Sequence, residues 1–305
     1  AVAQYTTFET LIETLRQPGA KEAIQYFQTA FVGSIGPREV FTPTSLSYAR
    51  FLAAEGVLYP GKKENTFKIS SPLVLSLIIL QVIPFVFPSA PKMGIPRRND
   101  GLHVMDTLQV LKECVCAFDK DTIRAARIQS FKIAETKVAG RLGVMVPRET
   151  VYDAELNRIL MNWLVVHGNF QIAGQWYTNT KECLVGQRRK VKNRYCDLVI
   201  TPEFDSTASI TIRHPGVLLE LIASADEKNL EEHFERAQKY GKMIGINEKL
   251  AGLNVVHFWH DRTFDNVDMI ARCLDTNGTV SDIKPERIVR PSVLHSIRNF
   301  FSYYT

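Results

Sequence analysis

The chain has 305 residues, of which 45% are hydrophobic and 23% are charged, and its formal net charge is +5. This composition excludes a globally disordered chain, and the chain is long enough to form two hydrophobic cores. The five cysteines have the spacing of neither a disulfide scaffold nor a zinc site, so they predict reduced thiols and an intracellular location. Two alternatives are left within this prediction: a nuclear location, and secretion followed by delivery into a host cell.

Residues 1–90 predict a small, mainly helical domain. The stretch "FETLIETLRQPGAKEAIQYFQTAF" predicts two helices separated at Pro18 and Gly19. The stretch "TPTSLSYARFLAAEG" predicts another helix with a Thr or Ser cap and an end at Gly56. A two-stranded hairpin follows in "VLYPGKKENTFKISS". Helices followed by a hairpin are the outline of a winged-helix-like domain.

The most apolar stretch, residues 71–89, is interrupted by Gln81, Pro84 and Pro88. A membrane span needs about 20 uninterrupted apolar residues, so we predict a buried helix, then an extended segment, and no membrane partner. Proline, glycine and charged residues in "SAPKMGIPRRNDG" predict a linker at residues 91–101. A further helix is expected in "LHVMDTLQVLKECVCAFD".

The pattern changes near residue 150 to alternating helices and strands. A helix is predicted in "ETVYDAELNRILMNWLVVHG", with Gly168 at its end, followed by a strand in "FQIAGQWYT". Two apolar strands, "RYCDLVI" and "GVLLELIA", precede a helix in "NLEEHFERAQKYGKMIG" and a strand in "LNVVHFWHD". The stretch "VDMIARCLD" predicts a final helix. Residues 102–305 are therefore expected to form an α/β domain with helices on either side of a sheet.

Two carboxylates are the main candidate site residues, because each lies inside an apolar strand. They are Asp197 and Glu220. Two like charges placed side by side by adjacent strands need a cation between them, and oxygen ligands favour Mg²⁺ or Mn²⁺. Glu155, at the border of the buried side of the preceding helix, is a third candidate.

A basic segment, "KECLVGQRRKVKNR", precedes the strand that carries Asp197. Such a run is often only a solvated loop, but beside a metal site it can bind phosphates. The candidate nucleic-acid contacts are Arg188, Arg189, Lys190, Lys192 and Arg194.

The helix acid, the strand Asp and the strand Glu, in the order helix, three strands, helix, resemble the PD-(D/E)XK or restriction-endonuclease-like nucleases over residues 102–275. The resemblance implies a mixed sheet flanked by helices, in which Asp197 and Glu220 bind the metal and Glu155 assists. The family carries a lysine two residues after the Glu. This chain has Ile222 there instead.

Four stretches resemble the nuclease domains of Crinkler-type proteins of fungi and oomycetes: "VPRETVYDAELNRILMNWL", "GQWY", "LLELIAS" and "EEHFERAQKYG". That group has an apolar residue in place of the lysine. It also has a downstream helix, which here offers His233, Arg236 and Tyr240 at helical spacing. The resemblance implies that Arg236 or His233 supplies the missing cation, and Lys239 and Lys242 are alternatives.

The same resemblance implies a winged-helix-bearing ATPase region before the nuclease. The stretch "AAEGVLYPGKKENTFKISSPLV" is similar to the winged-helix region that follows the ATPase core in some AAA+-like proteins. No GxxxxGK[ST] phosphate loop occurs in the sequence, so if an ATPase domain belongs to this protein, it is expected upstream of residue 1.

The predicted function is Mg²⁺- or Mn²⁺-dependent hydrolysis of nucleic-acid phosphodiesters, with DNA favoured over RNA. The alternative is a catalytically inactive module of the same fold that binds nucleic acid or protein. The third hypothesis is that the chain is a structural, regulatory region attached to an upstream ATPase.

Overall fold

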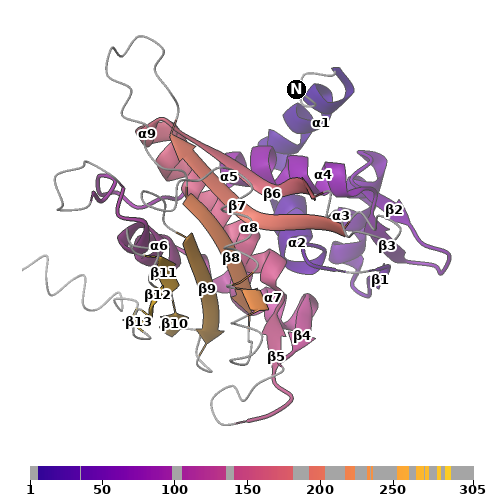
Figure 1. The fold of residues 1–305 in the computed structure, drawn as a ribbon. Coiled ribbons are helices and arrows are strands. Elements are labelled where there is room, and N and C mark those ends of the chain that lie inside the picture. The colour runs from indigo at the N-terminus through magenta and orange to yellow at the C-terminus, as the bar shows by residue number, and fades with distance from the viewer. Residues whose placement is uncertain are drawn as a thin grey trace, which may run out of the picture.

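The computed structural model describes the backbone of residues 6–34, 36–97, 105–134, 141–180, 192–202, 217–223, 232–233, 235, 253–260, 266–270, 272–274, 280–282 and 286–289. Beyond residue 173 it describes side chains at residues 198–201, 217, 219, 221, 232, 233 and 235. These residues form a mixed α/β structure (Figure 1), as predicted.

The first helices begin and end at the capping and helix-breaking residues of the sequence. Helix α1 (Thr6–Arg16) ends before the 3₁₀ turn η2 (Pro18–Ala20), and α2 (Lys21–Ala30) follows directly. Proline fits the start of a helical turn because its missing N–H is not needed there. Helix α3 (Pro43–Ala54) begins where the Oγ1 of Thr42 accepts a hydrogen bond from the Ser45 backbone N–H at 3.1 Å. It ends before Gly56, whose φ of 77° suits glycine.

The predicted hairpin is present and belongs to a three-stranded antiparallel sheet of order β1-β3-β2. Its two strands are β2 (Leu58–Pro60) and β3 (Thr66–Ile69). The third strand, β1 (Arg38–Glu39), was not predicted because two residues carry no readable period. Arg38 donates a hydrogen bond to the carbonyl of Ala30 at 2.5 Å, which satisfies a terminal carbonyl of α2.

The apolar stretch after the hairpin is helical, as predicted, but it is not one regular α-helix. It consists of α4 (Pro72–Leu77), the π-helical turn η3 (Ile78–Val82) and α5 (Ile83–Val86). The π turn ends two residues before Pro84, which has no N–H to continue the α-helical hydrogen bonds. Within the described ranges, none of the helices is both long enough and apolar enough to cross a membrane.

Two capped helices follow. Helix α6 (Thr107–Cys116) is capped by Asp106, and α7 (Lys120–Gln129) is capped by Asp119. A small antiparallel pair, β4 (Phe131–Ile133) and β5 (Met145–Pro147), comes next.

Helix α8 (Glu149–Leu160) is the central element. It continues through the π-helical turn η4 (Met161–Val165) into α9 (Val166–Gly168), so the predicted end at Gly168 is confirmed. All residues from 151 to 160 are buried. Figure 1 shows α8 lying between the large sheet and the N-terminal helices, which explains why it has no solvated face.

The large sheet has six strands in the order β13-β10-β9-β8-β7-β6. The pair β8 and β9 is parallel, and the other neighbours are antiparallel. A parallel neighbour requires a crossover connection, which here spans residues 224–252. The strands are β6 (Phe170–Thr180), β7 (Lys192–Pro202), β8 (Val217–Ala223), β9 (Leu253–His260), β10 (Asn266–Ile270) and β13 (Glu286–Val289).

The four strands predicted for this sheet, β6 to β9, are confirmed. The prediction of a final helix is wrong. The stretch "VDMIARCLD" contributes to β10 and to β11 (Arg272–Leu274), which pairs with β12 (Val280–Asp282). Strand β10 is hydrogen-bonded on both sides, to β9 and to β13. Such pairing partners override the weak local helical pattern of so short a stretch.

Most buried apolar residues of the described chain gather in two large clusters. One is built from α1 to α5 and the hairpin, and the other from α6, α7, α8, β7 and β8. Ala154 of α8 belongs to the first cluster, so α8 contacts both. The described part of the predicted linker packs on the second cluster through Ile95, and the Met93 carbonyl accepts a hydrogen bond from the Trp163 indole at 3.0 Å. The predicted boundaries at 1–90, 91–101 and 102–305 stay predictions.

Candidate functional site

The two strands that carry Asp197 and Glu220 are neighbours. Strands β7 and β8 are antiparallel, and their register pairs Leu198 with Leu219. The next positions along the same register are Asp197 on β7 and Glu220 on β8. Residues opposite one another in an antiparallel pair share a face of the sheet at Cβ separations of about 5 Å. The pairing of β7 with β8 ends at Leu198–Leu219, so Asp197 and Glu220 lie directly beyond the last pair, and continuing the same register would bring them opposite one another.

The side chains of Asp197 and Glu220 lie outside the described ones, so a metal site at these positions stays a prediction. Leu198, Leu219 and Leu221 are buried in the cluster that also contains α8 residues. Because strand residues alternate between faces, the register by itself does not bring Glu155 of α8 to this pair of positions.

The other predicted site residues are described only in part. Glu232, His233 and Glu235 are helical, which agrees with the helix predicted there, and His233 is partly exposed. Lys192 and Arg194 lie in β7, opposite Thr180 and Thr178 of β6. Outside the described residues lie Arg188, Arg189, Lys190, Arg236, Lys239, Tyr240 and Lys242.

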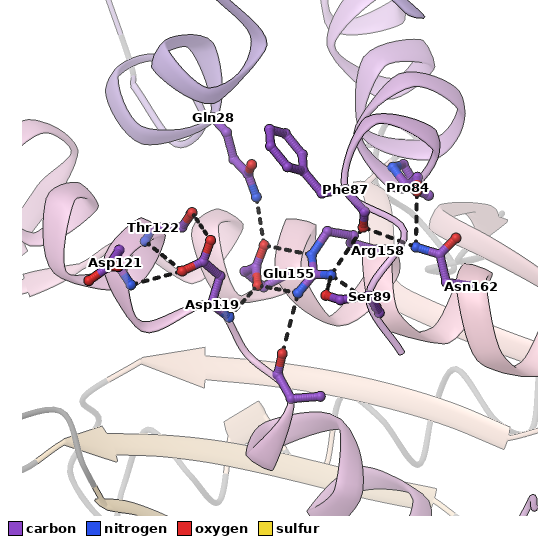
Figure 2. A network of polar contacts seen from close by, with 11 residues as sticks. Gln28, Pro84, Phe87, Ser89, Asp119, Asp121, Thr122, Glu155, Arg158 and Asn162 are labelled. Carbon is purple, nitrogen blue, oxygen red and sulfur yellow. Dashed lines mark hydrogen bonds and ion pairs between the residues drawn. The ribbon is translucent and has the colours of Figure 1, made fainter. Parts of the chain in front are cut away.

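Glu155, which is itself fully buried, lies at the centre of a polar network (Figure 2). Its Oε1 accepts a hydrogen bond from the Gln28 side chain of α2 at 2.6 Å. Its Oε2 accepts one from the backbone N–H of Asp119 at 2.9 Å. Both oxygens also accept from Arg158, one turn further along α8, at 3.0 and 2.8 Å. The carboxylate is thus held by three separate segments of the chain.

The guanidinium of Arg158 connects the same network to a fourth segment. It donates to the carbonyls of Phe87 and Ser89 at 3.2 and 3.0 Å, and to the Ser89 hydroxyl. It also donates to the carbonyl of Ala117 at 3.4 Å. A buried ion pair is tolerated only when its remaining donors and acceptors are satisfied, and this one meets that condition.

These contacts give Glu155 a structural role. Each of its oxygens already accepts two hydrogen bonds, and the pair Glu155–Arg158 links α2, the loop before α7 and the segment after α5 to α8. The sequence placed Glu155 at the border of the buried side, whereas its side chain is completely buried. A part for Glu155 in catalysis stays a prediction.

Sequence reasoning missed a second acid on α8. Asp153 is buried, and its Oδ1 accepts a hydrogen bond from the Asn157 side-chain amide at 3.0 Å. Burial raises the pKa of the Asp153 carboxyl to about 7, although the hydrogen bond from Asn157 opposes the shift. Its i, i+4 spacing to Asn157 was visible in the sequence, but burial on this side of α8 was not.

Asp153 predicts a pH dependence of stability. Its folded-state pKa of about 7 lies above the ordinary value of 3.8, so the stabilisation is complete below about pH 4 and is lost as the pH rises through 7. Between pH 5 and 8 we expect the free energy of unfolding of the wild type to fall by on the order of 1–4 kcal/mol. Asp153→Asn, which mimics the neutral acid, should abolish this fall. Urea unfolding at several pH values measures it.

The control for this prediction is Asp121→Asn, because the side chain of Asp121 is 82% exposed. The control should leave the pH profile of the wild type unchanged. A wild-type stability that is flat or rises over this pH range would contradict the burial of an ionisable Asp153.

One of the predicted thiols is described in detail. Cys114 is fully buried in the second cluster. Burial raises the pKa of its thiol well above the usual range, and the neighbouring Glu113 adds to the rise. A thiol of this kind is inert, which agrees with the prediction of a buried reduced cysteine.

The fold defines a mixed α/β protein in which one buried helix joins an N-terminal helical unit to a six-stranded sheet. Comparisons of this chain with models of protein families, with curated proteins and with solved structures find no match.

Proposed function

We propose that the chain is a metal-dependent nuclease of the restriction-endonuclease-like class, acting on DNA in preference to RNA. The observation that supports this function most directly is that Asp197 and Glu220 lie directly beyond Leu198 and Leu219, the pair at which the pairing of β7 with β8 ends. The order of helix α8, the antiparallel strands β6, β7 and β8, and a parallel strand β9 after a crossover agrees with the order expected from the resemblance.

In this proposal Asp197 and Glu220 hold one Mg²⁺ or Mn²⁺ ion through hard oxygen ligands. The metal lowers the pKa of a bound water and stabilises negative charge on the phosphate. Arg236 or His233 contributes the cation that the family supplies from the position of Ile222. The basic segment that includes Arg188, Arg189 and Lys190 holds the phosphate backbone of the substrate.

The N-terminal elements support the predicted winged-helix-like part of the proposal. Helices α1 to α3 precede the hairpin β2–β3, and the sheet order is β1-β3-β2. An ATPase region upstream of residue 1 belongs to the same proposal and rests on the resemblance.

The test is binding and cleavage with and without the metal. We expect Asp197→Asn and Glu220→Gln each to weaken Mg²⁺ binding by more than about 10–100-fold, the loss that follows from changing even an outer-shell group. Calorimetry with Mg²⁺ alone measures affinity, and cleavage of plasmid and single-stranded DNA with Mg²⁺, Mn²⁺ or a chelator measures activity.

The matched control is Asp121→Asn, which removes an exposed carboxylate from α7. It should leave metal affinity unchanged. If the wild type takes up no Mg²⁺ and cleaves nothing, the proposal fails. The catalytically inactive binding module, which Ile222 favours, then takes its place.

A further inference from the structure

The solvent side of the hairpin β2–β3 carries aromatic and basic side chains together. We call the set Phe41, Tyr59, Lys62, Lys63 and Lys68 the wing face. Tyr59 of β2 lies directly opposite Lys68 of β3, and the Lys68 ammonium is 5.5 Å from the centre of the Tyr59 ring. Tyr59 is nevertheless 59% exposed.

The alternation of the two strands separates this face from the core. Leu58, the neighbour of Tyr59, and Phe67, the neighbour of Lys68, are both buried. Because successive strand residues point to opposite sides, the hydrophobic residues hold the hairpin on the domain while Tyr59 and Lys68 stay in solvent.

Phe41 adds a second exposed ring beside the hairpin turn. The preceding residue, Val40, is buried, and its backbone N–H donates to the carbonyl of Asn65 at 2.9 Å. Asn65 is the last residue of the turn that contains Lys62 and Lys63. Because Val40 is hydrogen-bonded to Asn65, the next residue, Phe41, lies beside this turn. The Phe41 side chain is 82% exposed, far more than a phenylalanine that serves only the core.

The charge around these rings is positive. Lys62, Lys63 and Lys68 are exposed, and in the described part of the chain none of them forms an ion pair. The nearby acids are Glu39 on β1 and Glu64 in the turn, both exposed. Three lysines against two carboxylates leave an excess of positive charge on the face that carries the two aromatic rings.

We propose that the wing face binds single-stranded nucleic acid, with Phe41 and Tyr59 stacking on unpaired bases and the three lysines contacting phosphates. Exposed aromatic rings within a basic surface fit this ligand because bases stack on such rings without sequence preference. An acidic peptide would pair with the lysines but would gain little from two exposed flat rings. The inference does not depend on a metal at Asp197 and Glu220.

The test is fluorescence anisotropy in EDTA with three probes: a 20-nucleotide oligo-dT, a duplex of the same length and an acidic peptide. The Asp197→Asn, Glu220→Gln background is used throughout, so a failure of the proposed metal site does not affect the result. We expect the oligo-dT to bind most tightly. Phe41→Ala and Tyr59→Ala should each weaken its binding by about 10-fold, a typical loss for one stacked base.

Neutralising the three lysines to glutamine should lower the slope of log K against log salt by about 2, since a single strand contributes about 0.7 per phosphate contact. The controls are Leu142→Ala with Val166→Ala, two exposed apolar residues elsewhere, and the triple neutralisation of Lys92, Arg124 and Arg141. These variants should keep wild-type binding and slope.

Three results would overturn the inference. One is oligo-dT binding that survives loss of both rings and all three lysines. Another is an equal loss in the control variants. The third is tighter binding of the peptide or the duplex than of the single strand. All the exposed positions changed on the wing face should leave the thermal midpoint unaltered, so misfolding does not account for a loss.

Discussion

Replacing Arg158 by alanine is expected to lower the free energy of unfolding by about 3–5 kcal/mol. The substitution removes one partner of a fully buried ion pair and leaves the Glu155 carboxylate charged and without its two hydrogen bonds from the guanidinium. It also strips the donor from the carbonyls of Phe87 and Ser89. Equilibrium urea unfolding gives the value directly.

The chain contains a matched control for this effect. Arg124 and Asp121 on α7 form an ion pair with the same i, i+3 spacing and an N–O distance of 2.7 Å, close to the 2.8 Å of Arg158–Glu155. The side chains of the control pair are 51% and 82% exposed. Arg124→Ala should therefore cost less than about 1 kcal/mol, and the difference between the two substitutions isolates the contribution of burial.

Glu155→Gln separates the structural role of Glu155 from the catalytic one. A structural role predicts a loss of stability similar to that of Arg158→Ala, with Mg²⁺ affinity and cleavage unchanged where the protein is folded. If Glu155→Gln instead abolishes cleavage and leaves stability intact, Glu155 acts in the proposed site. A cost below about 1 kcal/mol for Arg158→Ala would show that the network does not hold the segments together.

The second large effect concerns the cation that replaces the missing lysine of the proposed nuclease. We expect Arg236→Ala or His233→Ala to reduce cleavage by about 10²-fold or more, the loss that follows removal of one charge-stabilising group. Metal affinity should stay close to that of the wild type because neither residue is a metal ligand in this proposal. Single-turnover cleavage and Mg²⁺ calorimetry on the same samples test both parts.

Ile222→Lys supplies the independent check. In the Arg236→Ala background, partial recovery of cleavage would support a cation that has moved to the downstream helix. Cleavage by Ile222→Lys alone, with an inactive wild type, would identify the chain as a nuclease fold that has lost its chemistry. Unchanged cleavage in both alanine variants would contradict the roles given to His233 and Arg236, and Lys239 and Lys242 would be tested next.

Local signals in the sequence were sufficient for most helices and strands. The cap at Thr42 and the glycine at position 56 each involve residues within four positions of the helix they terminate. The residues that flank the two carboxylates most closely are apolar, Cys196 and Leu198 to Ile200 in β7 and both halves of β8, which is typical of strands in the middle of a sheet. Because these features depend on neighbours along the chain, the sequence was enough to predict them.

The sequence also identified Asp197 and Glu220 as candidates, since a carboxylate in an apolar strand stands out without any knowledge of its partners. Their positions relative to one another depend on the register of the two strands, and one residue of slip would move them apart. The register pairs Leu198 with Leu219, and both leucines are buried in the same hydrophobic cluster, which favours this register over a slipped one.

Arg158 lies at helical i, i+3 spacing from Glu155, but the other two partners of Glu155 could not be read from the sequence. Gln28 lies 127 residues away and the donating N–H of Asp119 lies 36 residues away, so neither has a spacing that a periodicity can reveal. The strand β10 was missed for the same reason, because its stability comes from β9 and β13 on either side. The sequence determined which residues favour helix or strand and which are costly to bury. The tertiary structure decided which distant groups satisfy the buried charge, because hydrogen bonds form between groups that packing brings together, whatever their separation along the chain.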